Sequence, residues 1–348
     1  MNNKSLLEIL NPTLNSTILI YDVHASESGA LAILNDLYNQ IVNYEDKSVK
    51  WVFIVSTPLY EEKDNIIVRR YPWVKKNWFY RYYFNKITTR KILKEYKPDK
   101  VFSLQNEAIN FFDKEQYVYL HLPFILTNHK FSLFKDGKTL WLYQNVISKM
   151  IFHSLRKANY TIVQTNWMKD ALIKKANIQS DKIIIIQPDI SSNKIKTYID
   201  SQNNRNSFFY PATAFTYKNH FTLLRALNYV KQKGYNDWEL LLTIKDNENA
   251  YTKKLYKYSS EKQLNVKFNG PISREDVFLN YTNSILIFPS YVESFGLPLL
   301  EAKMTGTIII ASDTPYSREI LNGYNKAYFF NEMDYKELGN IILKISFS

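Results

Sequence analysis

Short apolar runs alternate with longer stretches of helical periodicity along most of the chain. In the first half, the apolar runs are rich in Ile, Val, Phe and Tyr, a composition that favours buried strands. They predict strands at Thr17–Tyr21, Trp51–Ser56, Val101–Leu104, Gln116–His121, Tyr160–Gln164 and Lys182–Gln187. Helical patterns between these runs cover Ser28–Val42, Leu140–Ala158 and Asn166–Lys175. Strands that alternate with helices over this length predict a doubly wound parallel sheet.

The alternation restarts after a polar stretch, Asp189–Asn206, which is the best candidate for a linker. Beyond it, strands are predicted at Ser207–Tyr210, Glu239–Ile244, Val266–Phe268, Ser284–Phe288, Thr307–Ala311 and Ala327–Phe330. Helices are predicted at His220–Lys233, Ala250–Lys262, Arg274–Tyr281, Leu297–Thr305, Tyr316–Leu321 and Tyr335–Ile345. We therefore expect two α/β domains, residues 1–195 and residues 206–348.

Length and composition agree with two domains of ordinary size. The chain has 348 residues, and its hydrophobic fraction of 45% is enough for two large cores. It contains no cysteine, which excludes disulfides and thiolate metal sites. The first residues lack the apolar segment of a signal peptide, and no run approaches the roughly 18 apolar residues that span a bilayer. These features predict a cytoplasmic protein.

The formal net charge of +12 points to an anionic partner. Much of this charge lies in Arg69–Lys94, where nine Lys and Arg residues occur without any Asp or Glu. We call this stretch the basic–aromatic segment, because aromatic residues are interleaved with the charges. They are Tyr71, Trp73, Trp78, Phe79, Tyr80, Tyr82, Tyr83 and Phe84.

Three interpretations of the basic–aromatic segment are open. Lys and Arg can contact anionic lipid headgroups while Trp and Tyr lie at the membrane interface. Cations and aromatics can also bind the phosphates and bases of a nucleic acid. The third interpretation is a solvated helix whose aromatic side chains pack into the domain. We favour peripheral membrane contact, at the inner face of the membrane, over nucleic acid.

The stretch Phe288–Ala302 carries the clearest chemical pattern. An apolar run ends at Pro289, a polar turn follows, and Pro298 suits the first turn of a helix that Gly306 can close. Strand, loop and helix in this order place the loop at the carboxyl edge of a sheet, where helix N-terminal amides favour an anion. Two carboxylates, Glu293 and Glu301, flank the turn.

The Glu-x7-Glu spacing around Ser-Phe-Gly-Leu-Pro resembles the signature of glycosyltransferase family 4, the group 1 glycosyltransferases. The resemblance is specific over about Tyr210–Phe330 and looser before it. It implies a GT-B fold, in which two Rossmann-like doubly wound parallel-sheet domains face an interdomain cleft. It also implies a retaining, metal-independent enzyme with a nucleotide-sugar donor and no cofactor. The simpler alternative is an ordinary strand–helix unit with solvated glutamates.

The resemblance implies roles for residues of the second domain. Glu301 would accept hydrogen bonds from the ribose hydroxyls, and Glu293 would face the hydroxyls of the donor sugar. The remaining donor-binding candidates of this stretch, partly through backbone amides, are Ser294, Phe295, Gly296 and Leu297. Lys218 and Asn219 match a family loop whose lysine contacts the diphosphate, while Thr213 stands where the family has arginine.

In the first domain, His121 follows a predicted strand and precedes Pro123. It resembles a family histidine that faces the donor sugar, and an imidazole there can hold a hydroxyl or move a proton. Gly29 matches a glycine-bearing loop on the acceptor side. Family members usually run a final helix back across the first domain, and an end at Ser348 is short by that measure.

Lys218, Glu293 and His121 are therefore the catalytic candidates of a hexosyltransferase. We expect it to move a sugar from a UDP- or GDP-linked donor to a glycan or lipid-linked saccharide in cell-surface polysaccharide synthesis. Helix N-terminal amides and a lysine would stabilise the leaving diphosphate, since no Asp-x-Asp cluster for a metal is evident. The alternatives are a basic protein that binds membranes or nucleic acid, and a GT-B epimerase or phosphorylase.

Overall fold

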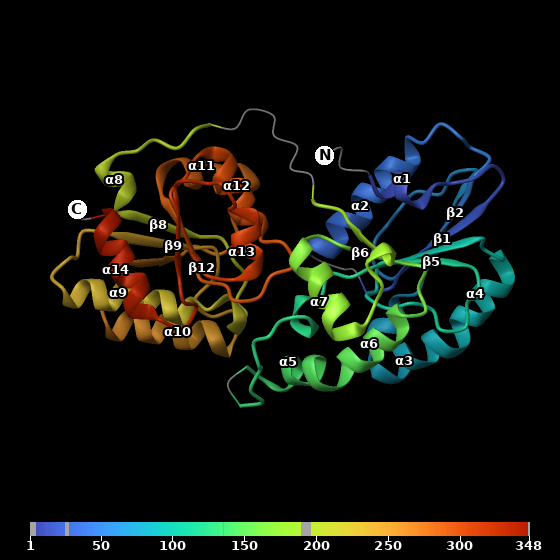
Figure 1. The fold of residues 1–348 in the computed structure, drawn as a ribbon, viewed down its shortest axis with the longest axis horizontal. Helices are drawn as coiled ribbons and strands as arrows, with labels where there is room; N and C mark the ends of the chain where they lie inside the picture. Colours follow the sequence, from blue (N-terminus) through green and yellow to red (C-terminus); the bar gives the residue numbers. More distant parts are fainter. Residues whose placement is uncertain (1–4, 25–27, 135, 189–195, 347–348) are drawn as a thin grey trace. The chain divides into compact units, whose positions relative to one another are not determined.

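The computed structural model of this chain describes residues 5–24, 28–134, 136–188 and 196–346 (Figure 1). The chain divides into two compact units, each built around one parallel sheet. The first unit comprises Met1–Leu126 and Thr139–Gln187, and the second comprises Thr127–Lys138 and Pro188–Ser348. The short segment Thr127–Lys138 thus belongs to the second unit, although it lies within the sequence range predicted for the first domain.

The first unit contains a seven-stranded sheet in the order β3-β2-β1-β4-β5-β6-β7, and every strand pair is parallel. The strands are β1 (Thr17–Asp22), β2 (Lys50–Val55), β3 (Ile66–Arg70), β4 (Lys100–Ser103), β5 (Glu115–Tyr119), β6 (Tyr160–Val163) and β7 (Ile183–Ile185). The chain runs from β1 outward to β3 and then returns to the other side of β1 as β4. The strand order therefore reverses between β1 and β4, where ligands of such sheets bind.

Helices cover both faces of this sheet. They are α1 (Leu6–Leu10), α2 (Ser28–Val42), α3 (Trp78–Tyr83), α4 (Thr89–Tyr96), α5 (Lys138–Leu142), α6 (Ser148–Leu155) and α7 (Asn166–Ala176). The single turns are η1 (Pro72–Lys75), η2 (Phe84–Thr88), η3 (Pro123–Ile125), η4 (Tyr143–Ile147) and η5 (Ser180–Lys182). In Figure 1, α1 and α2 lie on one side of the sheet and α3, α4 and α6 on the other.

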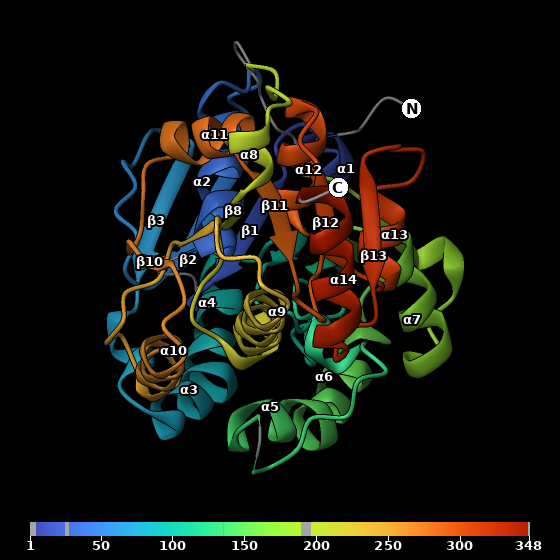
Figure 2. The ribbon, with the colours of Figure 1, turned by 90° about the vertical axis from the view of Figure 1, so that its left-hand side faces the viewer.

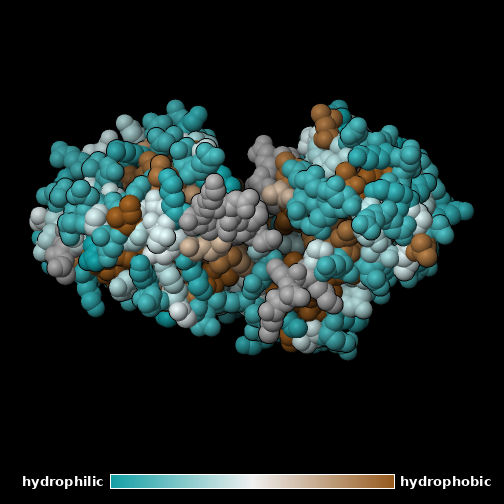
Figure 3. All heavy atoms as spheres, turned by 90° about the horizontal axis from the view of Figure 1, so that it is seen from above, coloured by the Kyte–Doolittle hydropathy of each residue, from teal (hydrophilic) through white to brown (hydrophobic). Residues whose placement is uncertain are grey.

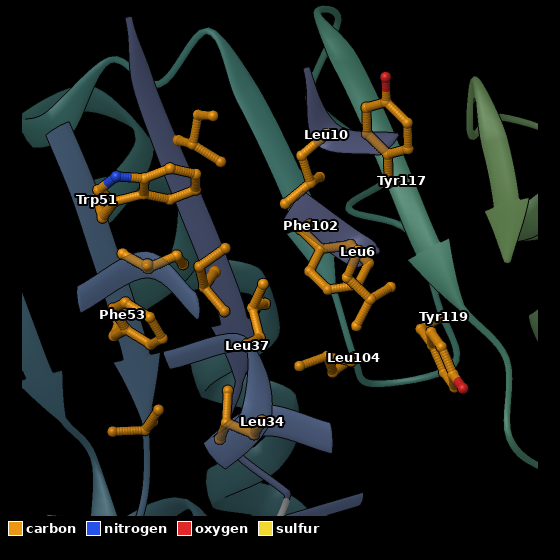
Figure 4. Close-up of a cluster of buried hydrophobic side chains, with 14 of the residues drawn as sticks. Leu6, Leu10, Leu34, Leu37, Trp51, Phe53, Phe102, Leu104, Tyr117 and Tyr119 are labelled. Atoms are coloured by element: carbon orange, nitrogen blue, oxygen red, sulfur yellow. The ribbon is translucent and has the colours of Figure 1, made fainter. Parts of the chain in front are cut away.

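The sheet buries both faces because successive strand residues point to opposite sides. Ile18 and Ile20 of β1 belong to the core under α1 and α2, whereas Leu19 packs in the opposite core with Phe84 and Ile92. Figure 4 shows the first of these cores: Leu6 and Leu10 of α1 lie beside Phe102 of β4 and Tyr117 of β5, and Leu34 and Leu37 of α2 lie on the side of Phe53 of β2. Nearly continuous apolar strands are the sequence pattern that such two-sided burial produces.

The second unit contains a six-stranded sheet in the order β10-β9-β8-β11-β12-β13, also parallel throughout. Its strands are β8 (Ser207–Tyr210), β9 (Glu239–Leu242), β10 (Val266–Phe268), β11 (Ile285–Phe288), β12 (Ile309–Ser312) and β13 (Ala327–Phe330). Its helices are α8 (Gln202–Arg205), α9 (His220–Gln232), α10 (Ala250–Glu261), α11 (Arg274–Asn283), α12 (Leu297–Thr305), α13 (Pro315–Ile320) and α14 (Tyr335–Ser346), with the turn η6 (Thr216–Lys218). Helices α9, α10 and α14 cover one face, and α11 and α12 cover the other (Figure 2).

Most of the predicted strands and helices of both halves are present, and the two parallel-sheet α/β units confirm the predicted fold class. The elements not predicted from the sequence include β3 (Ile66–Arg70), whose short apolar run ends in two arginines, and the five-residue helix α1. The helix predicted at Leu140–Ala158 is divided by the π-helical turn η4 between α5 and α6.

The predicted linker requires a correction over its second half. Residues 189–195 lie outside the described part of the chain, whereas residues 196–206 pack on the second unit. The amides of Tyr198 and Ile199 donate to Thr305 O at 2.8 Å and Thr282 O at 3.0 Å, and the Tyr198 side chain is buried. Polar composition misled the prediction, because α8 and its neighbours are satisfied by hydrogen bonds rather than by solvent.

The basic–aromatic segment also divides into two parts. Tyr71 and Trp73 pack against the buried ring of Phe84, at centroid distances of 5.0 and 5.8 Å. In contrast, Trp78 and Phe79 of α3 are 75% and 65% exposed. The interpretation in which all these aromatics pack into the domain is therefore wrong for α3. The face drawn in Figure 3 is mostly hydrophilic, with apolar side chains in separate patches.

Candidate functional site

The candidate donor site lies where the strand order of the second sheet reverses, between β8 and β11. These strands are adjacent and parallel, with Ile285 opposite Phe208, so the loops that follow them meet at one edge of the sheet. The first loop leads through η6 to α9, and the second leads to α12. Such a reversal leaves room for a ligand outside the carboxyl ends of the strands.

Lys218 and Glu293, one from each loop, form an ion pair at this edge. Lys218 Nζ lies 2.6 Å from Glu293 Oε1, and each side chain is only 15% exposed. The ammonium also lies 5.5 Å from the ring centroid of Tyr217. The pair thus places a cation and a carboxylate in a half-buried setting, where electrostatic interactions are stronger than at an open surface. The ammonium can donate further hydrogen bonds to an anion.

Asn219 joins the two loops. Its Nδ2 donates to Pro289 O at 3.1 Å and to Glu332 O at 2.6 Å, and its Oδ1 accepts from Thr222 Oγ1 at 2.8 Å. Its φ of 60° lies in the left-handed region, which asparagine tolerates better than most residues. The side chain that we predicted to bind the donor is therefore used, in this structure, to hold the loop of Glu293 beside that of Lys218.

The start of α12 has the backbone expected of a close approach to a ligand. Gly296 is the N-cap residue with φ 90°, and Pro298 occupies the first turn. A Cβ atom at Gly296 would lie 3.2 Å from the ring of Tyr316. Phe295 is buried and Leu297 is exposed, so the amides of this stretch rather than its apolar side chains are suited to a polar ligand.

Ser294 and Thr213 differ in their surroundings. Ser294, between Glu293 and Phe295, is half-buried, whereas Thr213 is exposed in the loop after β8 and its carbonyl accepts from Phe215 N at 2.9 Å. A threonine at this position offers a hydroxyl but no charge, so Lys218 is the cation that these two loops supply in the part of the chain described.

Glu301 belongs to a second group of side chains, one helical turn into α12. It is only 5% exposed, and its oxygens are bound by Arg274 Nη2 at 3.0 Å and by the hydroxyl of Tyr281 at 3.0 Å. Burial raises the pKa of Glu301, and the charge of Arg274 and the hydrogen bond from Tyr281 partly oppose this. A carboxylate held in this way keeps a lone pair on each oxygen for two neighbouring hydroxyls.

In the first unit, His121 lies just after β5. Its amide donates to Asn106 Oδ1 at 2.8 Å, and its Nε2 lies 3.2 Å from Asn106 Nδ2. Burial lowers the pKa of His121 to about 4, so the imidazole is neutral near pH 7. Within the described residues, its buried Nδ1 has no hydrogen-bond partner. A neutral ring of this kind can donate to, or accept from, a hydroxyl group.

A polar cluster lies at the reversal point of the first sheet, after β1 and β4. His24 Nε2 accepts from Arg81 Nε at 2.6 Å, and Glu107 Oε1 accepts from Asn85 Nδ2 at 3.2 Å. Burial, with the charge of Arg81 second, lowers the pKa of His24 to about 3, whereas burial raises the pKa of Glu107. These half-buried polar groups are suited to a polyhydroxylated ligand.

Gly29, the predicted acceptor-side residue, lies in the first turn of α2. Residues 25–27 of the same loop lie outside the described part of the chain. Among the described residues, no group of three or more His, Asp or Glu is arranged to hold a metal ion. Independence from metal and from cofactors stays a prediction.

Several residues of these groups carried no usable signal in the sequence. Arg274 and Tyr281 reach Glu301 from α11, and Asn85 of η2 reaches Glu107 in the loop after β4. Arg81 was noticed only as one charge of the basic–aromatic segment. Their partners are set by packing between elements, which spacing along the chain does not encode.

The fold is shared with several solved structures. Sucrose-phosphate synthase from Thermosynechococcus elongatus has a TM-score of 0.68 at 14% identity, covering 94% of this chain and 89% of that chain. HepE of Anabaena, in complex with UDP and glucose, has a TM-score of 0.68 at 16% identity with the same coverage. WaaG, a glycosyltransferase involved in lipopolysaccharide biosynthesis, has a TM-score of 0.68 at 12% identity, covering 95% and 90%. The protein therefore has the GT-B fold, as predicted.

Sequence comparison identifies the family. A family model described as "Glycosyl transferases group 1" matches residues 191–346, and one described as "Glycosyltransferase Family 4" matches residues 51–191. The O-antigen chain mannosyltransferase RfbU of Salmonella typhimurium is 22% identical over 244 residues, which is 68% of this chain and 66% of that protein. The chain thus aligns with just under two thirds of that relative. It belongs to the group 1 glycosyltransferases, as the Glu-x7-Glu pattern predicted.

Proposed function

We propose that this protein is a retaining, metal-independent hexosyltransferase that uses a nucleoside-diphosphate sugar and no cofactor. One observation carries the proposal: the half-buried Lys218–Glu293 pair at the reversal point of the second sheet, followed directly by the start of α12. Cleavage of the bond between sugar and phosphate develops negative charge on the leaving diphosphate. A cation and helix-end amides in a half-buried setting stabilise that charge without reorganising water.

The individual roles follow from the chemistry of each side chain. The ammonium of Lys218 binds the diphosphate, and its contribution grows as charge develops toward the transition state. Glu293 accepts hydrogen bonds from the sugar hydroxyls, and its negative charge stabilises the positive charge that develops at the anomeric carbon. Glu301, fixed by Arg274 and Tyr281, accepts the two ribose hydroxyls. His121 holds a hydroxyl as a neutral imidazole.

The relatives suggest donors and acceptors to try first. RfbU is named as a mannosyltransferase of the O-antigen chain, and the HepE structure contains UDP and glucose. We infer that the donor is a GDP- or UDP-linked hexose and that the acceptor is a glycan or a lipid-linked saccharide of a cell-surface polysaccharide. The acceptor would be held in the first unit by the cluster of His24, Arg81 and Glu107, near Gly29.

We also propose that α3 docks on the cytoplasmic face of a membrane, where lipid-linked acceptors are found. Its exposed aromatic side chains include Trp78 and Phe79, and exposed cations accompany them along the chain. These cations are Lys75, Lys76, Lys86, Arg90, Lys91 and Lys94. No described helix is both long enough and apolar enough to cross a bilayer. Nucleic acid is not the partner we propose.

A donor screen tests the main proposal. UDP and GDP are titrated into the wild type and into Glu301→Ala, and hydrolysis of UDP-glucose and GDP-mannose is followed with and without saccharide acceptors. We expect one nucleotide to bind and Glu301→Ala to weaken it by about 1–3 kcal/mol, because ribose hydroxyls lose their acceptor. Binding of neither nucleotide would refute the proposal. Turnover that needs inorganic phosphate, or that yields an epimer without any acceptor, would indicate a phosphorylase or an epimerase instead.

A further inference from the structure

The segment Thr127–Lys138 is an unusual part of the fold. It follows β5 and η3 in the sequence and ends at Lys138, the first residue of α5. The residues on either side of it, Leu126 and Thr139, belong to the first unit. The segment itself nevertheless belongs to the second unit. Its contacts there are made with the loop that follows β11, which carries Glu293.

Within this loop, Tyr291 is in contact with the segment. The ring of His129 lies 4.3 Å from the ring of Tyr291 with an interplanar angle of 33°, and the ring of Phe131 lies 6.5 Å away. The Tyr291 hydroxyl donates to Asp136 Oδ1 at 3.2 Å. Tyr291 is only 7% exposed and Phe131 only 4%. The side chain of Tyr291 is thus fixed both by a ring contact and by a hydrogen bond.

The partner of the Tyr291 hydroxyl is itself fixed within the segment. Asp136 Oδ2 accepts from Ser132 N at 2.7 Å, and Asp136 N donates to Ser132 O at 3.0 Å. Burial, with the charge of Asp136 second, raises the pKa of Tyr291, so the hydroxyl stays protonated and remains the donor. The carboxylate therefore has a defined position from which to hold the tyrosine.

The backbone of Tyr291 connects the same residue to the loop of Lys218. Tyr291 N donates to Tyr217 O at 3.2 Å, and Tyr217 directly precedes Lys218. Tyr291 also lies two residues before Glu293, whose carboxylate pairs with Lys218 at 2.6 Å. One residue therefore links three stretches of chain: the segment Thr127–Lys138, the loop of Glu293 and the loop of Lys218.

We propose that the segment Thr127–Lys138 is a positioning element of the donor site, which holds Glu293 in place beside Lys218 through Tyr291. This inference rests on the proposed function of that pair. The chain enters the second unit for this segment alone before residue 188, so the placing of the donor sugar depends on residues far from Glu293 in the sequence. Tyr291, Asp136 and His129 act through Glu293 and need not touch the donor.

Three variants of the full chain test the inference: Tyr291→Phe, Asp136→Ala and His129→Ala. We expect kcat for donor hydrolysis to fall about tenfold or more, because small misplacements of a reacting group are costly. We expect the Kd of UDP or GDP to stay within about threefold, because Glu301 and Lys218, rather than Glu293, hold the nucleotide. In the double variant Tyr291→Phe/Asp136→Ala, kcat should fall about as far as in the more impaired single variant. The reason is that both changes remove the same hydrogen bond between Tyr291 and Asp136.

The matched control is Phe134→Ala, which changes an apolar side chain of the same segment that is 94% exposed. It should leave kcat unchanged. Amide hydrogen exchange over residues 289–296 provides a second readout that needs no donor, and it should speed up in Asp136→Ala and Tyr291→Phe but not in the control. Faster exchange that is confined to residues 289–296 distinguishes a loosened loop from a variant that folds poorly, which would exchange faster throughout.

The outcomes separate this inference from the proposed function. If the wild type bound neither UDP nor GDP, the proposed function would fail, while exchange would still report whether the segment holds the loop. If the wild type turned over a donor and all three variants kept its kcat within about twofold, the inference alone would be overturned. Equal losses of kcat in the control and in the three variants would also overturn it.

Discussion

Lys218 and Glu293 form an ion pair at a half-buried position, where solvent screens the interaction between their charges only weakly. Each side chain is 15% exposed and the pair is separated by 2.6 Å. Removing one partner leaves the other charge without its counter-ion, which costs more than the pair itself contributes. Stability and catalysis are therefore both expected to depend on this pair, and variants must be chosen so that the two effects can be separated.

We predict that Lys218→Met lowers the free energy of unfolding by about 2 kcal/mol and donor turnover by at least about 100-fold. The double variant Lys218→Met/Glu293→Gln should regain much of the stability, since neither side chain is then charged, but none of the turnover. Thermal unfolding and donor hydrolysis measure the two effects. Recovery of turnover in the double variant would mean that the pair is only structural.

Glu301 leads to a prediction on pH. Burial raises its pKa, and Arg274 at 3.0 Å counteracts this. The ionised carboxylate accepts ribose hydroxyls best, so nucleotide affinity should fall as the pH falls through the pKa of Glu301. In Arg274→Gln the counteracting charge is gone, so the pKa rises further and the loss of affinity should begin at a higher pH.

Calorimetric titration of UDP or GDP at several pH values measures this shift. Arg318→Gln is the control, because it also removes one cation of the second unit, but Arg318 pairs with Asp313 at the surface. Identical pH profiles for the wild type and Arg274→Gln would show that Arg274 does not act on Glu301.

At the scale of elements, the start of α12 depends on a residue without a side chain. Gly296 has φ 90°, and a Cβ atom added to it would lie only 3.2 Å from the ring of Tyr316. The hydroxyl of Tyr316 donates to Ser290 O, at the beginning of the same loop. The glycine thus allows the loop and α13 to approach each other closely while the chain turns into the helix.

We predict that Gly296→Ala destabilises the protein by about 2–3 kcal/mol and impairs donor turnover, through both backbone strain and contact with Tyr316. Gly234→Ala is a matched control: its φ is 92°, but nothing lies within 4 Å of the added atom. It should cost only the strain, about 1 kcal/mol, and leave turnover unchanged. Equal effects of the two changes on unfolding and turnover would contradict the role given to Tyr316.

At the scale of the whole molecule, α3 is one of the elements that expose large apolar side chains. Trp78 and Phe79 are 75% and 65% exposed, in the stretch of chain that has no acidic residue between Arg69 and Lys94. Not all of its cations remain outside, since Arg81 reaches inward to His24. The remaining surface combines aromatic side chains with positive charge, which is the chemistry of an anionic lipid interface.

We predict that the protein sediments with vesicles rich in phosphatidylglycerol, but not with pure phosphatidylcholine, and less so as salt is added. Trp78→Ser/Phe79→Ser should weaken this binding at least about tenfold, because two large apolar side chains no longer enter the interface. Leu59→Ser/Met333→Ser changes side chains that are 78% and 50% exposed elsewhere, and should bind like the wild type. Equal binding of both double variants would refute the role of α3.

Much of the fold was readable from local pattern. The apolar runs at Thr17–Tyr21 and Ser284–Phe288 became β1 and β11 with nearly the predicted limits, because two-sided burial demands such runs. Pro298 and Gly306 likewise marked the ends of α12. Where composition was misleading, as at Tyr198 in the predicted linker, hydrogen bonds to distant residues decided the structure.

The amino-acid sequence by itself determined most of the order of strands and helices, and it determined that Lys218 and Glu293 each follow a strand. Periodicity, turn residues and helix caps are local properties, so they can be read along the chain. Only the tertiary structure decided that β8 and β11 are neighbours, that Arg274 binds Glu301, and that Asp136 holds Tyr291. Those partners are far apart in sequence, and the packing of whole elements, rather than any local preference, brings them together.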